Sequence, residues 1–204
     1  MLNLRVRPLV NRVVDPLARG LLRAGVVPDV VTVVGTVGAV ASALGLFSTG
    51  HFFTGTALVA LFVLTDLLDG AMARARGTGS RFGAFLDSTM DRFADAAIFG
   101  GLVLWYAGGG HDRRLLALAL FCLVTGSITS YAKARAEGLG MTCNVGIAER
   151  AERLIVVLLG TLLVGLGAPT WVLGVALGLL AAASAITVVQ RLVEVHRQAA
   201  LASS

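Results

Sequence analysis

Cysteine is scarce in this sequence of 204 residues, which contains only Cys122 and Cys143. Cys122 lies in an apolar run and Cys143 in a polar stretch, so no disulfide framework is predicted and we expect a reduced, cytoplasm-facing setting. The first residues lack an unbroken apolar core ahead of a small-residue cleavage site, so we expect no cleavable signal peptide. A convincing internal repeat is also missing, which argues against the paired halves of many transporters.

Charged residues are few as well, at 14% of the sequence, whereas apolar residues make up 56%. This balance is unlike that of a soluble domain and predicts an all-α, multi-pass membrane protein. We expect one domain over residues 25–204 with six transmembrane helices. They are predicted at residues 29–49, 53–76, 82–107, 113–136, 148–167 and 170–196.

The net charge of +5 follows membrane topology rather than nucleic-acid binding. With six spans, fifteen of the 17 Lys and Arg residues fall on one side, and only Arg113 and Arg114 fall on the other. Because cytoplasmic segments of membrane proteins are enriched in Lys and Arg, this side is predicted to be cytoplasmic. We therefore expect a plasma-membrane protein with both termini facing the cytoplasm.

Residues 1–24 combine apolar positions with arginines. Arg5, Arg12 and Arg19 recur every seven residues, which places a basic stripe along one side of a helix. We expect an amphipathic juxtamembrane helix that lies on the cytoplasmic leaflet and is held there by anionic lipid. Pro8 and Pro16 leave a frayed basic tail as the alternative.

Four aspartates follow at helical spacing. Asp66 and Asp69 are three residues apart, and Asp87 and Asp91 are four apart, so each pair shares one face of a helix. The apolar run over residues 52–65 has 14 residues. It covers about 21 Å, whereas the hydrocarbon core is roughly 30 Å thick. The spanning helix must therefore include the first pair, and the same argument places the second pair in the next helix.

Residues 77–80, Gly-Thr-Gly-Ser, have the composition of a turn. Folding the two helices back at this turn places Asp69 level with Asp87 and Asp66 level with Asp91. Four carboxylates at membrane depth repel one another, and a divalent cation is the simplest compensation. Oxygen ligands favour a hard ion such as Mg²⁺, Mn²⁺ or Ca²⁺ over zinc.

Basic residues surround the turn over residues 138–147. Lys133 and Arg135 end the fourth predicted helix, Arg153 begins the fifth, and Arg191 lies at the cytoplasmic end of the sixth. Guanidinium groups suit phosphate geometry, so we interpret this set as an anion site at the edge of the acidic cavity, with Arg191 the weaker member. The alternative is ordinary snorkelling, or pairing with Glu137, Glu149 and Glu152.

The acidic stretch resembles the signature of the CDP-alcohol phosphotransferase family. The pattern Asp-x-x-Asp-Gly-x-x-Ala-Arg, eight residues, Gly, three residues, Asp, three residues, Asp is matched without a gap from Asp66 to Asp91. The resemblance implies a membrane enzyme of six helices, commonly a homodimer. Such an enzyme transfers a phosphatidyl or similar group from a CDP-linked donor to an alcohol and releases CMP.

The resemblance also implies roles for individual residues. Asp66, Asp69 and Asp87 would bind two Mg²⁺ or Mn²⁺ ions, and Asp91 would bind metal and act as the catalytic base. The implied nucleotide-binding residues are Asp29, Thr32, Gly70, Ala73, Arg74 and Thr78. Asp29 stands where many relatives have Asn, and capping of the first spanning helix is an equal alternative for it.

Outside the acidic signature, residues 130–137 and 149–153 resemble actinobacterial members that join CDP-diacylglycerol to inositol 1-phosphate. We therefore expect CDP-diacylglycerol as donor and inositol 1-phosphate as acceptor, bound through Lys133, Arg135, Arg153 and Arg191. Glycerol 3-phosphate is the alternative acceptor. A cation transporter is the alternative from another class, but beyond Asp95 the helix has no further acid up to Ala107, and a closed-ended cavity favours an enzyme.

Overall fold

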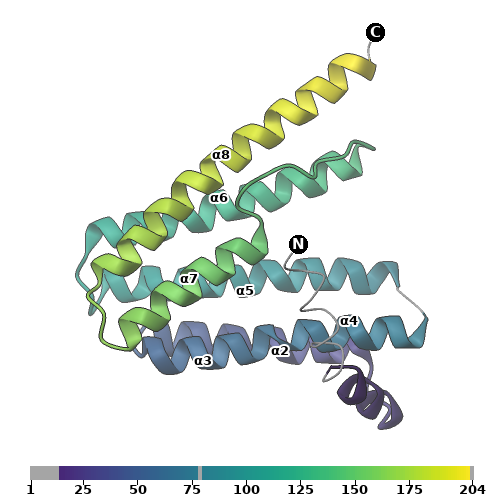
Figure 1. The fold of residues 1–204 in the computed structure, drawn as a ribbon, viewed down its shortest axis with the longest axis horizontal. Helices are drawn as coiled ribbons and strands as arrows, with labels where there is room; N and C mark the ends of the chain where they lie inside the picture. Colours follow the sequence, from purple (N-terminus) through teal and green to yellow (C-terminus); the bar gives the residue numbers. More distant parts are fainter. Residues whose placement is uncertain (1–13, 78–79, 203–204) are drawn as a thin grey trace. The chain divides into compact units, whose positions relative to one another are not determined.

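The computed structural model describes residues 14–77 and 80–202, in which every regular element is a helix (Figure 1). Residues 14–23 form the first described helix. The others are α2 (Pro28–Ser42), continued by a π-helical turn η1 (Ala43–Phe47), α3 (Phe52–Val63), α4 (Thr65–Arg76), α5 (Arg81–Ala107), α6 (Arg113–Gly138), α7 (Arg150–Gly165) and α8 (Trp171–Ala202). The all-α class predicted from the sequence is confirmed.

The helix expected over residues 53–76 is interrupted at Leu64, between α3 and α4. The Thr65 hydroxyl donates a hydrogen bond to the Phe62 carbonyl at 2.6 Å. Leu64 itself keeps helical dihedral angles, with φ −65° and ψ −18°. A side chain that competes for a backbone carbonyl is a common cause of such a local change in a helix.

Among the described residues, four helical stretches are long and apolar enough to cross a membrane: Pro28–Phe47, Phe52–Arg76, Arg113–Gly138 and Trp171–Leu201. The prediction of a protein with several membrane-spanning helices is therefore supported. The two other predicted spans do not meet this standard. One of them, α5, carries Asp87, Asp91, Arg92 and Asp95. The other, α7, has only 16 residues, or about 24 Å.

The chain divides into two compact units, and unit 1 holds the described residues within Met1–Ser42 and Ala57–Ala94. Its core contains Ala18, Ala71 and Met72, with Val14 and Leu21 packed against them. The apolar side of helix 14–23 is thus covered by α4. Arg19 and Arg23 of the same helix are exposed, and residues 1–13 of the predicted amphipathic segment lie outside the described residues.

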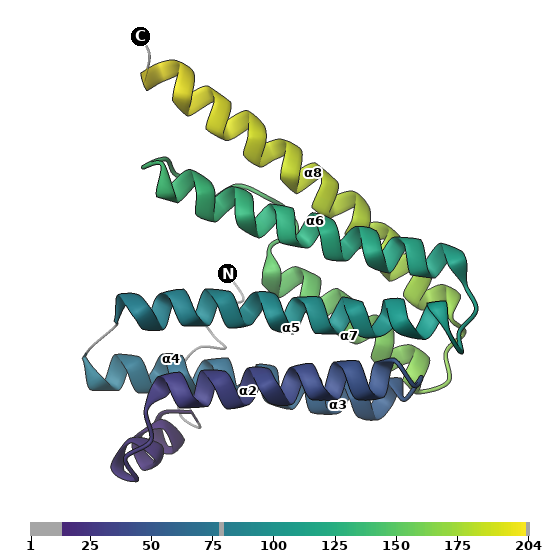
Figure 2. The same ribbon diagram turned by 180° about the vertical axis from the view of Figure 1, so that it is seen from behind.

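Small residues allow the helices of unit 1 to pack closely. A side chain at Gly35 of α2 would overlap Thr65, and one at Gly38 would overlap the ring of Phe62. Close approach through glycine is a common mode of helix association in membranes. It fixes α2 beside α4, as Figures 1 and 2 both show.

Unit 2 holds Ala43–Thr56 and the described residues from Asp95 onward. In it, α8 packs against both α6 and α7. Leu173 and Leu177 of α8 and Val157 of α7 are fully buried. The hydroxyl groups of Thr56 and Thr161 are 2.7 Å apart and join α3 to α7.

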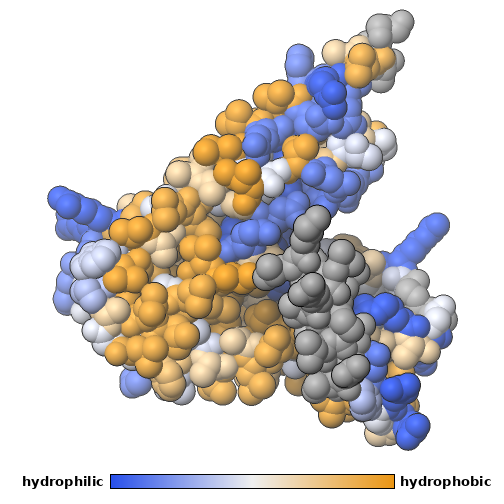
Figure 3. Space-filling model, viewed as in Figure 1, coloured by the Kyte–Doolittle hydropathy of each residue, from blue (hydrophilic) through white to orange (hydrophobic). Residues whose placement is uncertain are grey.

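The outer surfaces of α7 and of the first part of α8 are apolar (Figure 3). Exposed side chains there include Leu159, Leu163, Trp171, Val175 and Leu179. Hydrophilic side chains gather toward the carboxyl end of α8 (Figure 3). An apolar surface bounded by a hydrophilic end is the pattern expected of helices that contact lipid.

Candidate active site

Three of the four predicted metal ligands line one cavity of about 360 Å³ in unit 1. Asp66 and Asp69 project from α4, and Asp87 projects from the first half of α5. Four predicted nucleotide-binding residues also line it, namely Asp29, Thr32, Gly70 and Ala73. Among the described residues of this wall, Arg76 is the only Lys or Arg. With four carboxylates and one guanidinium, the wall carries an excess of negative charge.

Asp69 is the most enclosed of these carboxylates, with only 6% of the residue exposed. The Thr32 hydroxyl of α2 donates a hydrogen bond to Asp69 Oδ2 at 2.5 Å. A buried carboxylate needs such partners because desolvation is costly. Thr32, predicted as a nucleotide contact, therefore also fixes a predicted metal ligand.

Gly83 leaves room for the polar groups at the start of α5. Its backbone N–H donates to Ser80 Oγ at 2.7 Å. A Cβ at this position would lie 2.9 Å from Ser80 Oγ and 3.4 Å from Asp29 Oδ1. At Gly70 a Cβ would meet only Arg74 Nη1, at 3.4 Å, so the backbone there is open toward the cavity.

The other residues predicted for this site are placed differently. Asp91 lies one turn beyond Asp87 on α5, is not part of the cavity wall, and has its Oδ2 3.7 Å from Arg92 Nη2. Arg74 is also off the wall, and Thr78 lies outside the described residues. The predicted turn begins as expected, because Gly77 ends α4 with φ 68° and donates its N–H to the Arg74 carbonyl.

The donor set of the cavity fits a hard divalent cation. Asp66, Asp69 and Asp87 offer carboxylate oxygens, which Mg²⁺ and Mn²⁺ prefer, and the excess negative charge favours a cation. Among the residues that the structure describes, no three Asp, Glu, His or Cys side chains are grouped tightly enough to hold an ion as they stand. Binding would therefore draw these oxygens closer together around the ion.

Of the predicted acceptor-site residues, Arg153 is the most deeply buried, at 1% exposure. It lies in unit 2, where its Nη2 donates to Asp95 Oδ2 at 2.8 Å and its Nη1 donates to the Ala148 carbonyl at 3.3 Å. Arg150 Nε approaches the other oxygen of Asp95 at 3.5 Å. Asp95 and Arg150 were not predicted as site residues, although each is three or four residues from one that was.

Arg191 connects α8 to the segment between α6 and α7. Its Nε donates to the Val145 carbonyl at 2.9 Å and its Nη1 donates to the Thr129 carbonyl at 2.6 Å. Its Nη2 lies 3.5 Å from Glu149 Oε1. Arg191 is 3% exposed, so in this structure its guanidinium serves mainly to hold the protein backbone.

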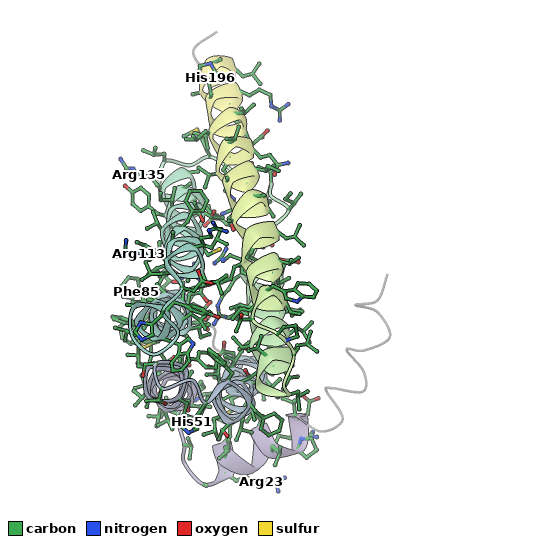
Figure 4. All side chains as sticks on the ribbon, turned by 90° about the vertical axis from the view of Figure 1, so that its left-hand side faces the viewer. Arg23, His51, Phe85, Arg113, Arg135 and His196 are labelled. Carbon is green, nitrogen blue, oxygen red and sulfur yellow. The ribbon has the colours of Figure 1, made fainter. Side chains whose placement is uncertain are left out.

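Lys133 and Arg135 lie near the carboxyl end of α6. Lys133 is half-buried, whereas Arg135 is exposed and lies on the side of α6 away from α8 (Figure 4). Arg153 and Arg191, in contrast, both donate hydrogen bonds to the segment between α6 and α7, at the Ala148 and Val145 carbonyls respectively. The four predicted acceptor residues differ widely in exposure.

Comparison with known families identifies the class of this protein. The family model for CDP-alcohol phosphatidyltransferase matches residues 25–189. The chain therefore belongs to the CDP-alcohol phosphatidyltransferase family and is an enzyme of that class, which confirms the family expected from the acidic signature.

Two curated relatives share the same printed name. A phosphatidylinositol phosphate synthase from Streptomyces avermitilis is 49% identical over 210 residues, covering 100% of this chain and 86% of the relative. A phosphatidylinositol phosphate synthase from Mycobacterium marinum is 53% identical over 188 residues, covering 91% of this chain and 80% of the relative.

Solved structures of the Mycobacterium tuberculosis phosphatidylinositol phosphate synthase are also similar. The structure with CDP-DAG bound has a TM-score of 0.87 at 52% identity and covers 90% of this chain and 94% of that chain. The structure in complex with manganese and citrate has a TM-score of 0.85 at 52% identity and covers 89% of this chain and 88% of that chain.

Proposed function

We propose that this chain transfers a phosphatidyl group from CDP-diacylglycerol to inositol 1-phosphate, giving phosphatidylinositol phosphate and CMP. The observation that carries the proposal is the shared cavity wall formed by Asp66, Asp69 and Asp87 together with Gly70 and Ala73. These residues belong to the family signature, and relatives at about half identity are named for this synthesis. Family membership also argues against the cation-transporter alternative.

The reaction is a substitution at phosphorus. An oxygen of an inositol hydroxyl forms a bond to the phosphorus that carries diacylglycerol, the bond from that phosphorus to CMP breaks, and CMP departs with the electron pair. The Asp91 carboxylate accepts the proton of the attacking hydroxyl. A carboxylate is a weak base, so the position of Asp91 one turn beyond Asp87 matters more than its basicity.

The acidic cavity is proposed to hold two divalent cations, Mg²⁺ or Mn²⁺, through Asp66, Asp69, Asp87 and Asp91. When bound, such ions neutralise phosphate charge and stabilise the attacking and leaving oxygens. The protein itself contributes Thr32, which orients Asp69, and the open backbone at Gly70, which allows a bulky nucleotide to approach. Asp29, Ala73, Arg74 and Thr78 are proposed as further nucleotide contacts.

The acceptor phosphate is proposed to bind through Arg153, Lys133 and Arg135, with Arg191 supporting the segment that Arg153 contacts. A guanidinium can bind phosphate through two parallel hydrogen bonds. This basic set favours a phosphorylated acceptor over a neutral alcohol.

The membrane arrangement is proposed from charge and length. Placing α5 and α7 among the spans gives six, and fifteen of 17 basic residues then lie on the side of the acidic signature. That side is proposed to face the cytoplasm of the plasma membrane, with both termini. The donor's acyl chains would remain in lipid while its nucleotide enters from the aqueous side, and a homodimer is proposed as the assembly.

An acceptor screen tests the function. Purified protein is mixed with CDP-diacylglycerol, Mg²⁺ and one of inositol 1-phosphate, glycerol 3-phosphate, inositol or serine, and CMP release is measured. We expect the highest kcat/KM with inositol 1-phosphate. An Asp91→Asn variant should lose roughly 10²- to 10⁴-fold in rate, the usual contribution of a general base. Asp112→Asn, at the start of α6, is the control that should keep full activity.

Two outcomes would revise the assignment. A higher kcat/KM with glycerol 3-phosphate would identify the alternative acceptor and make the chain a phosphatidylglycerophosphate synthase. Full activity of the Asp91→Asn variant would remove the proposed base while leaving the overall reaction in place.

A further inference from the structure

A buried cluster of three charges lies in unit 2. Arg153 of α7 is 1% exposed and Asp95 of α5 is 8% exposed. Their Nη2 and Oδ2 atoms are 2.8 Å apart, and Arg150 Nε lies 3.5 Å from Asp95 Oδ1. Charged side chains are seldom this buried unless they are paired. Asp95 thus lies between two guanidinium groups, and that of Arg153 is the more deeply buried.

The Arg153 guanidinium is also confined by the backbone of α6. A Cβ at Gly126 would lie 3.1 Å from Arg153 Nε and 3.5 Å from its Cζ. The distance to Nε is tighter than ordinary van der Waals contact, so a larger residue at this position would displace the guanidinium by a few tenths of an ångström. Asp95, the Ala148 carbonyl and Gly126 therefore define the position of Arg153 on three sides.

The hydrogen bonds of Arg153 leave part of its donor capacity unused. An arginine has five N–H groups, and those on Nη2 and Nη1 reach Asp95 and Ala148. Among the described residues, Nε is buried and has no hydrogen-bond partner. A buried ion pair that serves stability alone gains from full hydrogen bonding. A guanidinium that is fixed at two of its nitrogens and keeps spare N–H donors is suited to receive an anion.

We propose that Asp95 and Gly126 are positioning residues that hold the Arg153 guanidinium in the orientation needed to bind the acceptor's phosphate. This inference rests on the proposed function, because it assigns Arg153 to the acceptor. Asp95 fixes one edge of the guanidinium by a charge-assisted hydrogen bond, and Gly126 provides the space beside Nε. Neither residue touches the acceptor; both act through Arg153.

The test separates positioning from simple structural support. We expect Asp95→Asn to raise the KM for inositol 1-phosphate about tenfold, the loss typical of a weakened charge-assisted contact. The kcat at saturating acceptor and the KM for CDP-diacylglycerol should change less than about twofold, because neither depends on acceptor affinity. Asp95→Glu, which keeps the charge, should recover part of the affinity.

Gly126→Ala gives an independent test that does not remove a buried charge. The added methyl group should displace Arg153 by a few tenths of an ångström and raise the acceptor KM about threefold. Gly178→Ala on α8 is the matched control, because a Cβ there meets no atom within 4 Å. It should leave every constant unchanged.

Binding measured by calorimetry keeps the two proposals distinguishable. Full-length protein in detergent is titrated with inositol 1-phosphate, without donor, and then with inorganic phosphate. Weaker binding in Asp95→Asn and Gly126→Ala, with unchanged binding in Gly178→Ala, would support the positioning role. This holds even if the wild type releases no CMP, because absence of CMP release would contradict the proposed function and not the positioning role. Variants that lose folded protein or kcat but keep the wild-type KM and Kd would overturn the positioning role.

Discussion

The acidic cavity of unit 1 and the Asp95–Arg153 pair of unit 2 differ in how the charge of their carboxylates is balanced. The cavity wall carries four carboxylates and one guanidinium. In unit 2 the buried carboxylate of Asp95 lies between Arg150 and Arg153, so the protein itself supplies the counter-charges. The first region carries the charge that the proposed cation would balance, whereas the second has counter-charges within the protein.

This difference predicts which region contributes mainly to activity and which also contributes to stability. Charge that is left for a ligand makes binding strong but costs stability while the ligand is absent. Charge that is balanced within the protein stabilises the fold only when both partners are present, because removing one leaves the other buried. Substitutions in the cavity should therefore mainly affect activity, and substitutions in the pair should also affect stability.

The largest expected effect is the removal of divalent cations. Treatment with EDTA should lower CMP release at least about a hundredfold, and added Mg²⁺ or Mn²⁺ should restore it. Because the ion would bind the folded protein only, added metal should also raise the thermal unfolding midpoint. Asp87→Asn should lose most of that rise. An EDTA-treated protein with full activity would contradict the proposed metal chemistry.

The second effect is on stability. Arg153→Ala removes the guanidinium that lies 2.8 Å from the buried Asp95 carboxylate, and should lower the free energy of unfolding by about 3 kcal/mol. Asp87→Asn, at an exposed position, should change it by less than about 0.5 kcal/mol. Chemical unfolding in detergent measures both. Equal losses would remove the distinction between the two regions.

The sequence predicted the acidic cavity because its residues are linked by local geometry. Helical spacing placed Asp66 and Asp69 on one face, and glycine at position 77 marked the end of α4, where φ is 68°. Once the hairpin is formed, the meeting of Asp69 and Asp87 on one wall follows from their distance to the turn. No contact between distant parts of the chain was needed.

Contacts across long sequence separations could not be predicted in this way. Thr32 and Asp69 are 37 residues apart, and Asp95 and Arg153 are 58 apart. Spacing along a helix shows which residues share a face but not which other helix that face meets. The interruption at Leu64 was missed for a related reason, because it depends on one hydroxyl of Thr65 reaching a backbone carbonyl.

A third effect concerns the Thr32 hydroxyl, which donates a hydrogen bond to a cavity carboxylate. Thr32→Val keeps the shape of the side chain but removes the hydrogen bond to Asp69 Oδ2. Hydrogen bonds to charged groups contribute roughly 1.5–3 kcal/mol. We therefore expect kcat/KM to fall about tenfold. Thr36→Val, one turn further along α2, is the matched control that should keep its activity.

The smallest expected effect tests whether hydrogen bonds between α8 and the backbone at Ala148 help to orient Arg153. Thr187 Oγ1 accepts hydrogen bonds from the backbone N–H groups of Ile147 at 3.1 Å and Ala148 at 3.0 Å. Ala148 is also the residue whose carbonyl accepts from Arg153. Thr187→Val should therefore cost about 1 kcal/mol of stability and loosen the backbone that orients the guanidinium. We expect a rise of about twofold in the acceptor KM.

Thr161→Val is the matched control for this last change. Thr161 is as buried as Thr187, and its hydroxyl lies 2.7 Å from that of Thr56, away from the segment that Arg153 contacts. Hydrogen bonds between membrane helices contribute about 0.6 kcal/mol on average, so the loss of stability should be similar in size. Only Thr187→Val should change the acceptor KM. If both variants raised the acceptor KM equally, the change would reflect general loosening of unit 2. The contacts around Asp95 and Arg153 would then have no specific effect on acceptor binding.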